Sequence, residues 1–143
     1  MSELLSATRS NALAYARGST RENLAALEAN TVDAIKLASL ALIIDGKDLT
    51  DEDVIAFANR FEDIACHGED GPWLFAYPRE FLRGLADLSP ERMPEIAEAW
   101  AGTEEACLDR WNVADTRDFL QCVSTFCAES VAAARDLFLF VAL

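Results

Sequence analysis

The stretch that decides the predicted fold is DTRDFLQCVSTFCAESVAAARDLFLFVAL, residues 115–143. Its apolar residues recur at steps of three and four, which is the spacing of one face of an α-helix. We therefore expect Asp115 to cap a final helix that runs to about Val141. The core stripe expected for this helix comprises Phe119, Cys122, Val123, Phe126, Cys127, Val131 and Leu137.

The end of this stretch carries no charge after Asp136. A frayed apolar tail would leave its surface in water, which costs free energy. We therefore expect the tail either to dock into the domain or to be buried against a second copy of the chain. The second alternative predicts a homodimer formed through the apolar C-terminal helix.

Helical spacing also dominates the rest of the chain. Alanine and leucine supply 43 of the 143 residues, against 12 valines and isoleucines, and this balance favours helix over sheet. Thr50 precedes three acidic residues and is expected to cap a helix. The sequence thus predicts an all-α single domain, residues 1–143, built as a bundle of five to six helices. Besides the last one, helices are expected over residues 3–16, 19–44, 51–64, 78–88 and 90–111.

An aromatic segment interrupts the helical pattern. Trp73, Phe75 and Tyr77 alternate with small or aliphatic residues, which predicts an extended segment with three aromatic rings on one side. These rings either fill the core or act as anchors on a contact surface, together with the preceding Glu69 and Asp70.

Negative charge is concentrated in two segments. The chain has 25 acidic and 12 basic residues, a formal net charge of −13, which argues against binding to nucleic acid or an anionic membrane. Residues 45–70 hold nine acids and two bases, and residues 91–118 hold eight acids and three bases. On the expected helix, an acidic stripe lies opposite Trp100 and Leu108. Its members are Glu91, Glu95, Glu98, Glu105 and Asp109.

This stripe is either a solvated face with salt bridges from elsewhere or a binding surface for a cationic partner. The second interpretation predicts a non-enzymatic binding protein that engages a basic protein partner. By class analogy, small acidic helical bacterial proteins often act as immunity proteins or inhibitors that cover the cationic active site of a toxin or nuclease. A regulatory or scaffold subunit, in which the acidity only confers solubility, is a further alternative.

Two carboxylate pairs suggest an enzymatic alternative. Glu95-x-x-Glu98 followed by Asp115-x-x-Asp118 resembles the E-x-x-E…E-x-x-D arrangement of all-α nucleotide pyrophosphohydrolases of the MazG and dimeric dUTPase type. Asp115 stands where that arrangement has its third Glu. The resemblance implies that the four carboxylates hold Mg²⁺ and direct it at a pyrophosphate. The main interpretation involves no cofactor, metal or catalytic residue.

Other catalytic signatures are sparse. His67 is the only histidine, the four cysteines contain no C-x-x-C pair, and no glycine-rich phosphate loop is present. We expect the cysteines to be reduced thiols. The sequence shows no secretory signal and no apolar run long enough to span a bilayer, so a cytoplasmic protein of bacterial type is expected. The cysteines are Cys66, Cys107, Cys122 and Cys127.

Overall fold

The described residues form five strands and seven helices, so the predicted all-α bundle is wrong. The computed structural model describes residues 1–19, 21–66 and 68–143, with Cys66 described by its backbone alone. The strands are β1 (Ser2–Ala7), β2 (Ala25–Glu28), β3 (Glu62–Cys66), β4 (Trp73–Ala76) and β5 (Asp136–Val141). The helices are α1 (Arg9–Ala16), α2 (Ala34–Ile44), α3 (Asp51–Ala58), α4 (Arg79–Ala86), α5 (Met93–Ala101), α6 (Glu104–Leu108) and α7 (Val113–Ala132).

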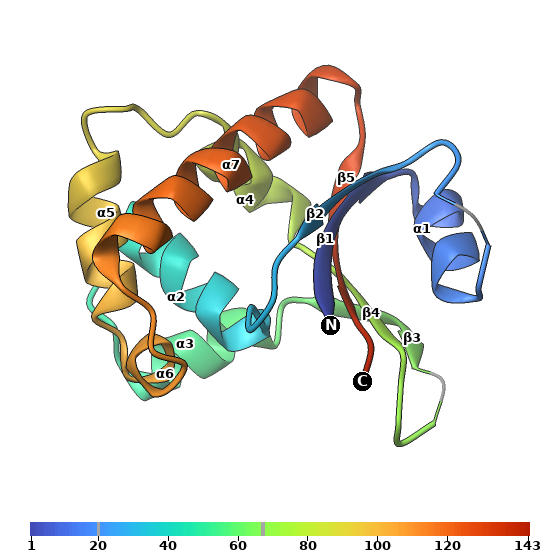
Figure 1. Cartoon of the computed structure of the whole chain (residues 1–143), viewed down its shortest axis with the longest axis horizontal. Coiled ribbons are helices and arrows are strands. Elements are labelled where there is room, and N and C mark those ends of the chain that lie inside the picture. The colour runs from blue at the N-terminus through green and yellow to red at the C-terminus, as the bar shows by residue number, and fades with distance from the viewer. Residues whose placement is uncertain (20, 67) are drawn as a thin grey trace.

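The strands build one antiparallel sheet in the order β2-β1-β5-β4-β3 (Figure 1). Its middle is formed by the first and last strands of the chain. Leu4 pairs with Leu139 and Leu5 pairs with Phe138, so residues more than a hundred positions apart are direct neighbours. The fold is therefore mixed α/β and is organised by contacts distant in sequence.

The two faces of the sheet are covered unequally. Helix α1 packs on one face, where Leu5, Phe138 and Phe140 belong to a small core. The remaining helices lie on the other face, where Leu4 and Leu139 join a larger core (Figure 1). Because both faces are covered, β1 is buried along its whole length.

The C-terminal helix forms as predicted but ends at Ala132 instead of about Val141, and the apolar tail docks into the domain, as the first of the two alternatives expects. Helix α7 covers Val113–Ala132, and its N-cap is Asn112 rather than Asp115. The chain then turns into β5, where residues 137–140 are buried between two strand neighbours. These neighbours satisfy the backbone groups of the apolar stretch. The surface on which the homodimer was predicted therefore lies inside the core of the chain itself.

The predictions for the N-terminal half fail in a similar way. Strand β1 occupies the first part of the predicted helix 3–16, and α1 begins only at Arg9. The predicted helix 19–44 is replaced by a loop, β2 and the shorter α2. Hydrogen bonding to distant strands outweighs the modest helical preference of leucine and alanine in β1.

Several local predictions are confirmed. The Thr50 hydroxyl accepts a hydrogen bond from the Asp53 N–H (3.1 Å) and caps α3. Residues 73–76 are extended, as expected, and α4 lies within the predicted helix 78–88.

The predicted helix 51–64 ends early at Ala58, and residues 62–66 form β3. The predicted helix 90–111 is divided into α5 and α6, because Thr103 caps a new helix after Gly102.

Candidate functional site

An open groove of about 700 Å³ lies between α2, the start of α3 and α6. Three large aliphatic side chains line it and are also exposed to water: Leu49 (41% exposed), Ile55 (53%) and Leu108 (76%). Single exposed aliphatic residues are common on protein surfaces, but a group of them in one hollow is typical of a contact surface.

The rim of this groove is acidic. Its carboxylates are Asp33, Asp51, Glu104 and Glu105, and no lysine or arginine is among the described residues that line it. Asp51 comes from the acidic segment 45–70, and the two glutamates come from the segment 91–118. The fold therefore brings both acidic segments to the same groove.

Three helix N-termini explain why acids occur here. Asp33 and Thr103 are the N-caps of α2 and α6, and Asp51 is the first residue of α3. Each N-terminus is equivalent to about half a positive charge, which favours nearby carboxylates. The four carboxylates carry more negative charge than the three helix N-termini offset, so the groove remains negative.

The predicted acidic stripe is not continuous. Glu91, Glu95 and Glu98 are exposed, before and on α5. The break between α5 and α6 places Glu105 on the groove instead, among the residues that line it. The stripe thus separates into Glu91, Glu95 and Glu98, which lie before and on α5, and Glu105, which lines the groove.

Asp109, the last member of the stripe, has a structural partner. The Lys36 ammonium group, on a side chain only 3% exposed, donates to Asp109 Oδ2 (2.5 Å) and to the Thr31 carbonyl (2.7 Å). It also lies 5.6 Å from the centre of the Trp111 ring. Asp109 therefore joins the turn after α6 to the start of α2 and is not a free surface charge.

The aromatic segment is divided between core and surface. Tyr77 is buried in the larger core, where its ring meets that of Phe61 edge to face (5.4 Å between centroids). This burial raises the pKa of the Tyr77 phenol. Trp73 is half-buried, and Glu69 and Asp70 are exposed in the loop before it. Tyr77 is thus placed as a core residue.

The four carboxylates of the enzymatic alternative do not form a cluster. The Asp115 N–H donates to Asn112 Oδ1 (2.8 Å), and the Asn112 amide donates to Asp115 Oδ2 (2.6 Å), which is a capping arrangement. Within the described residues, no three acidic, histidine or cysteine side chains are placed to hold a metal ion, Glu95, Glu98 and Asp118 included. His67 lies outside the described residues. The geometry gives the Mg²⁺ alternative no support.

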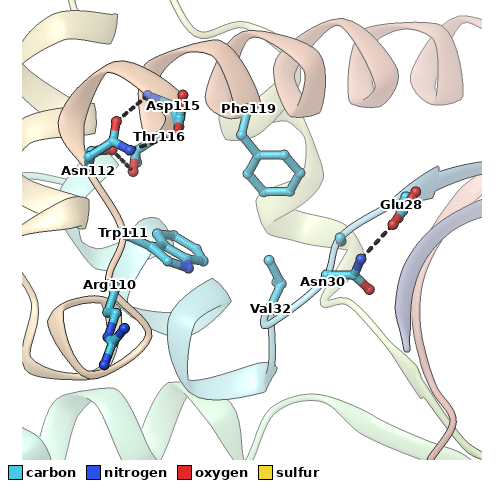
Figure 2. Close-up of a pocket in the computed structure, with 10 residues that line it drawn as sticks. Glu28, Asn30, Val32, Arg110, Trp111, Asn112, Asp115, Thr116 and Phe119 are labelled. Carbon is cyan, nitrogen blue, oxygen red and sulfur yellow. Dashed lines mark hydrogen bonds between the residues drawn. The ribbon is translucent and has the colours of Figure 1, made fainter.

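A second hollow, of about 400 Å³, lies where the loop after β2 meets the start of α7 (Figure 2). Trp111, Phe119 and Val32 form its apolar wall, and Glu28 and Asp115 lie on opposite sides of it. Of the residues that line it, the sequence predicts a site role for Asp115 alone and a core position for Phe119, because the set comes together only through the fold.

No protein-family model matches the chain, and no curated protein or solved structure matches it. The fold and site define a mixed α/β protein with a five-stranded antiparallel sheet and an acidic groove on its larger helical layer. Among the described helices, none has both the length and the apolar character needed to cross a membrane.

Proposed function

We propose that this protein is a non-enzymatic binding protein that engages a basic protein partner through the groove between α2, α3 and α6. The observation that carries the proposal is the position of Leu49, Ile55 and Leu108, exposed within an acidic rim. A basic amphipathic segment fits such a surface. Its apolar side chains cover the three aliphatic residues, and its lysines or arginines face the carboxylates.

The apolar and acidic parts of the surface have different effects on binding. Burial of the aliphatic side chains supplies most of the affinity, because apolar area leaves water. The carboxylates select a basic partner and accelerate encounter, to which Glu91, Glu95 and Glu98 add at longer range. A cationic toxin or nuclease has the required charge, and the protein would then act as its immunity protein or inhibitor.

The proposal places this interaction in the cytoplasm. Cys107, Cys122 and Cys127 are free thiols in the structure, which suits a reducing compartment. A basic partner made in the same compartment would be available to the groove without export.

The proposal is tested by isolating the complex from the native host and mapping it by chemical cross-linking. We expect a basic protein whose cross-links fall near residues 49–55 and 104–108. The double variant Ile55→Ser/Leu108→Ser should recover at least about tenfold less partner, since two contact residues are truncated. The matched control is Leu143→Ser, which alters a leucine outside the groove that is more exposed (90%) than Ile55 or Leu108.

Salt separates the proposal from the scaffold alternative. Glu104→Gln/Glu105→Gln should slow association at low salt, and the difference from the unsubstituted protein should diminish as salt screens the charges. The control is Glu95→Gln/Glu98→Gln, which should have the smaller effect. Equal recovery of one partner by the groove double variant and by Leu143→Ser would contradict the proposal.

A further inference from the structure

The two edges of the sheet differ in how open they are. At the β3 edge, Glu62 and Asp63 carry charge, and the register shifts between Asp63 and Ala65. Charged side chains and bulges of this kind hinder the addition of a further strand. The β2 edge has neither feature over residues 25–27, and its register with β1 is continuous. Of the described elements, β1 alone packs extensively against β2, so the β2 edge is the open one.

The free edge of β2 presents unpaired backbone groups. The Ala29 N–H donates to the Ser2 carbonyl (2.9 Å), and hydrogen-bonded pairs alternate along an antiparallel ladder. Leu27 therefore also directs its backbone groups at β1, whereas Ala26 and Glu28 direct theirs at the free edge. Within the described residues, these N–H and C=O groups of Ala26 and Glu28 have no hydrogen-bond partner. Ala26 is half-buried and Glu28 is exposed, so another backbone can reach this edge.

The pocket in Figure 2 opens where this edge ends, because Ala29, the residue after β2, lines it. Alternate residues of a strand share one face, and Leu27 and Ala29 both pack with the larger core. A residue opposite Leu27 in an added strand has its side chain on that same face. Trp111 and Phe119, which form the pocket wall, also pack against the larger core. The open edge and the pocket are therefore on the same face of the sheet.

The aromatic wall of the pocket is fixed before anything binds. The Trp111 indole N–H donates to the Thr31 hydroxyl (2.9 Å), and the Phe119 ring stacks on Trp100 (6.1 Å between centroids). The Lys36 ammonium group already lies 5.6 Å from the centre of the Trp111 ring, so an uncharged group is favoured there over a second cation. The volume of about 400 Å³ accommodates a large apolar side chain.

We propose that an extended segment of a partner protein adds to β2 as a further antiparallel strand and places a large uncharged apolar side chain in this pocket. Hydrogen bonds to the backbone of Ala26 and Glu28 supply affinity, and the pocket selects the side chain opposite Leu27. The antiparallel direction continues the sheet, in which every described pair of strands is antiparallel. The pocket and the acidic groove share none of their described lining residues, so this inference does not depend on the proposed function.

The test uses the full chain and the uncharged peptide Ser-Thr-Thr-Phe-Thr-Thr-Ser, acetylated and amidated at its ends. The NMR signal of the Trp111 indole N–H should shift saturably, with a dissociation constant on the order of 1 mM. At saturation, the amide protons of Ala26 and Glu28 should exchange with water about tenfold more slowly, because they become hydrogen-bonded. Replacing the phenylalanine of the peptide by serine should weaken binding at least about tenfold, because the pocket then buries no apolar side chain.

N-methylation of the peptide separates strand addition from simple burial of its phenylalanine. With the phenylalanine opposite Leu27, the threonines on either side of it direct their N–H groups at β2, and its own N–H points away. N-methylation of either of these threonines should weaken binding about tenfold or more, because a hydrogen bond to β2 is lost. N-methylation of the phenylalanine should change the affinity by less than about threefold, because no hydrogen bond to the protein is lost.

The matching change in the protein is Ala26→Pro, which removes an N–H from the free edge and is of a kind that edge strands tolerate. It should weaken peptide binding about tenfold, whereas the control Ala26→Ser retains the N–H and should bind like the unsubstituted protein. Thermal melts check that both variants fold, and the N-methylated peptides require no variant. Equal binding of the N-methylated peptides, or unchanged amide exchange at Ala26 and Glu28, would overturn the proposal. Self-association of the chain that Ala26→Pro abolishes would also overturn it, because a second copy would then occupy the edge.

Discussion

The ammonium group of Lys36 lies 2.5 Å from the carboxylate of Asp109 and connects the start of α2 to the turn after α6. The same ammonium group is 3.6 Å from Asp33, which lines the acidic groove, and lies against Trp111, which lines the second pocket. The Trp100 indole N–H also donates to the Lys36 carbonyl (2.9 Å). The buried Lys36 ammonium group therefore contacts one residue that lines the acidic groove, Asp33, and one that lines the second pocket, Trp111.

Loss of the Asp109 carboxylate should destabilise the protein. In Asp109→Ala the buried Lys36 ammonium keeps the Thr31 carbonyl and loses its closest anionic partner. We expect the free energy of unfolding to fall by about 1–3 kcal/mol, less than for a fully buried pair because Asp109 is 39% exposed. Urea denaturation measures the change. Glu95→Ala is the control and should stay within about 0.5 kcal/mol; an equal effect of both substitutions would contradict this role of Asp109.

The central position of β5 should make its side chains critical for stability. Phe138 is buried in the small core beneath α1, and Phe138→Ala should cost about 3–5 kcal/mol. Deletion of residues 138–143 removes most of a central strand and should abolish cooperative thermal unfolding. Circular dichroism melts provide the measurement, with Leu143→Ala (a residue 90% exposed) as the control. A deletion variant that melts like the full chain would refute the observed sheet order.

Alkaline pH should destabilise the fold through Tyr77. Its folded-state pKa is raised by burial, whereas the unfolded chain releases the phenolic proton near pH 10. The folded state therefore holds the proton more tightly, and this contribution is complete below about pH 10 and lost as pH rises toward the folded-state pKa. Urea unfolding of Tyr77→Phe at pH 8 and above pH 10 should show a smaller alkaline loss than the unsubstituted protein. An identical alkaline loss in both proteins would show that Tyr77 ionises freely.

The described cysteines should differ in reactivity. Cys107 and Cys122 are exposed, whereas Cys127 is buried and burial raises its pKa to about 12. Because the thiolate is the reactive form, iodoacetamide at pH 8 should modify the first two in the native protein and Cys127 only after unfolding. Mass spectrometry of the separated peptides reads each site. Rapid native modification of Cys127 would mean that α7 opens more readily than its packing indicates.

The parts of the fold that could be predicted depend on local signals. The Thr50 cap of α3 and the first part of α7 are encoded by neighbouring residues, so the sequence identified them. Strands β1 and β5 are buried on both faces and lack the polar alternation that identifies a half-buried strand. Their partners are also distant in sequence, which no local pattern reveals. The short, aromatic run of β5 was the one available signal for a buried strand.

The candidate site was partly predictable for the same reason. The negative charge of segments 45–70 and 91–118 was evident, but their meeting at one groove depends on the fold. The sequence places Leu108 opposite the acidic stripe, on the apolar face, because it predicts one helix over residues 90–111. The break at Gly102 and Thr103 starts a new helix, and Leu108 is exposed there. Because the sequence does not predict the break between α5 and α6, it does not identify Leu108 as an exposed apolar residue of the groove.

The pairing of β1 with β5 also determines when the sheet can form during translation. Among the described strands, residues 2–7 are synthesised first, yet their central neighbour, residues 136–141, is synthesised last. Until then β1 has only the four-residue β2 as a partner, and one edge of its backbone remains open. Nascent chains stalled before β5 should therefore recruit chaperones and remain sensitive to protease, because the middle of the sheet is completed only after β5 has left the exit tunnel.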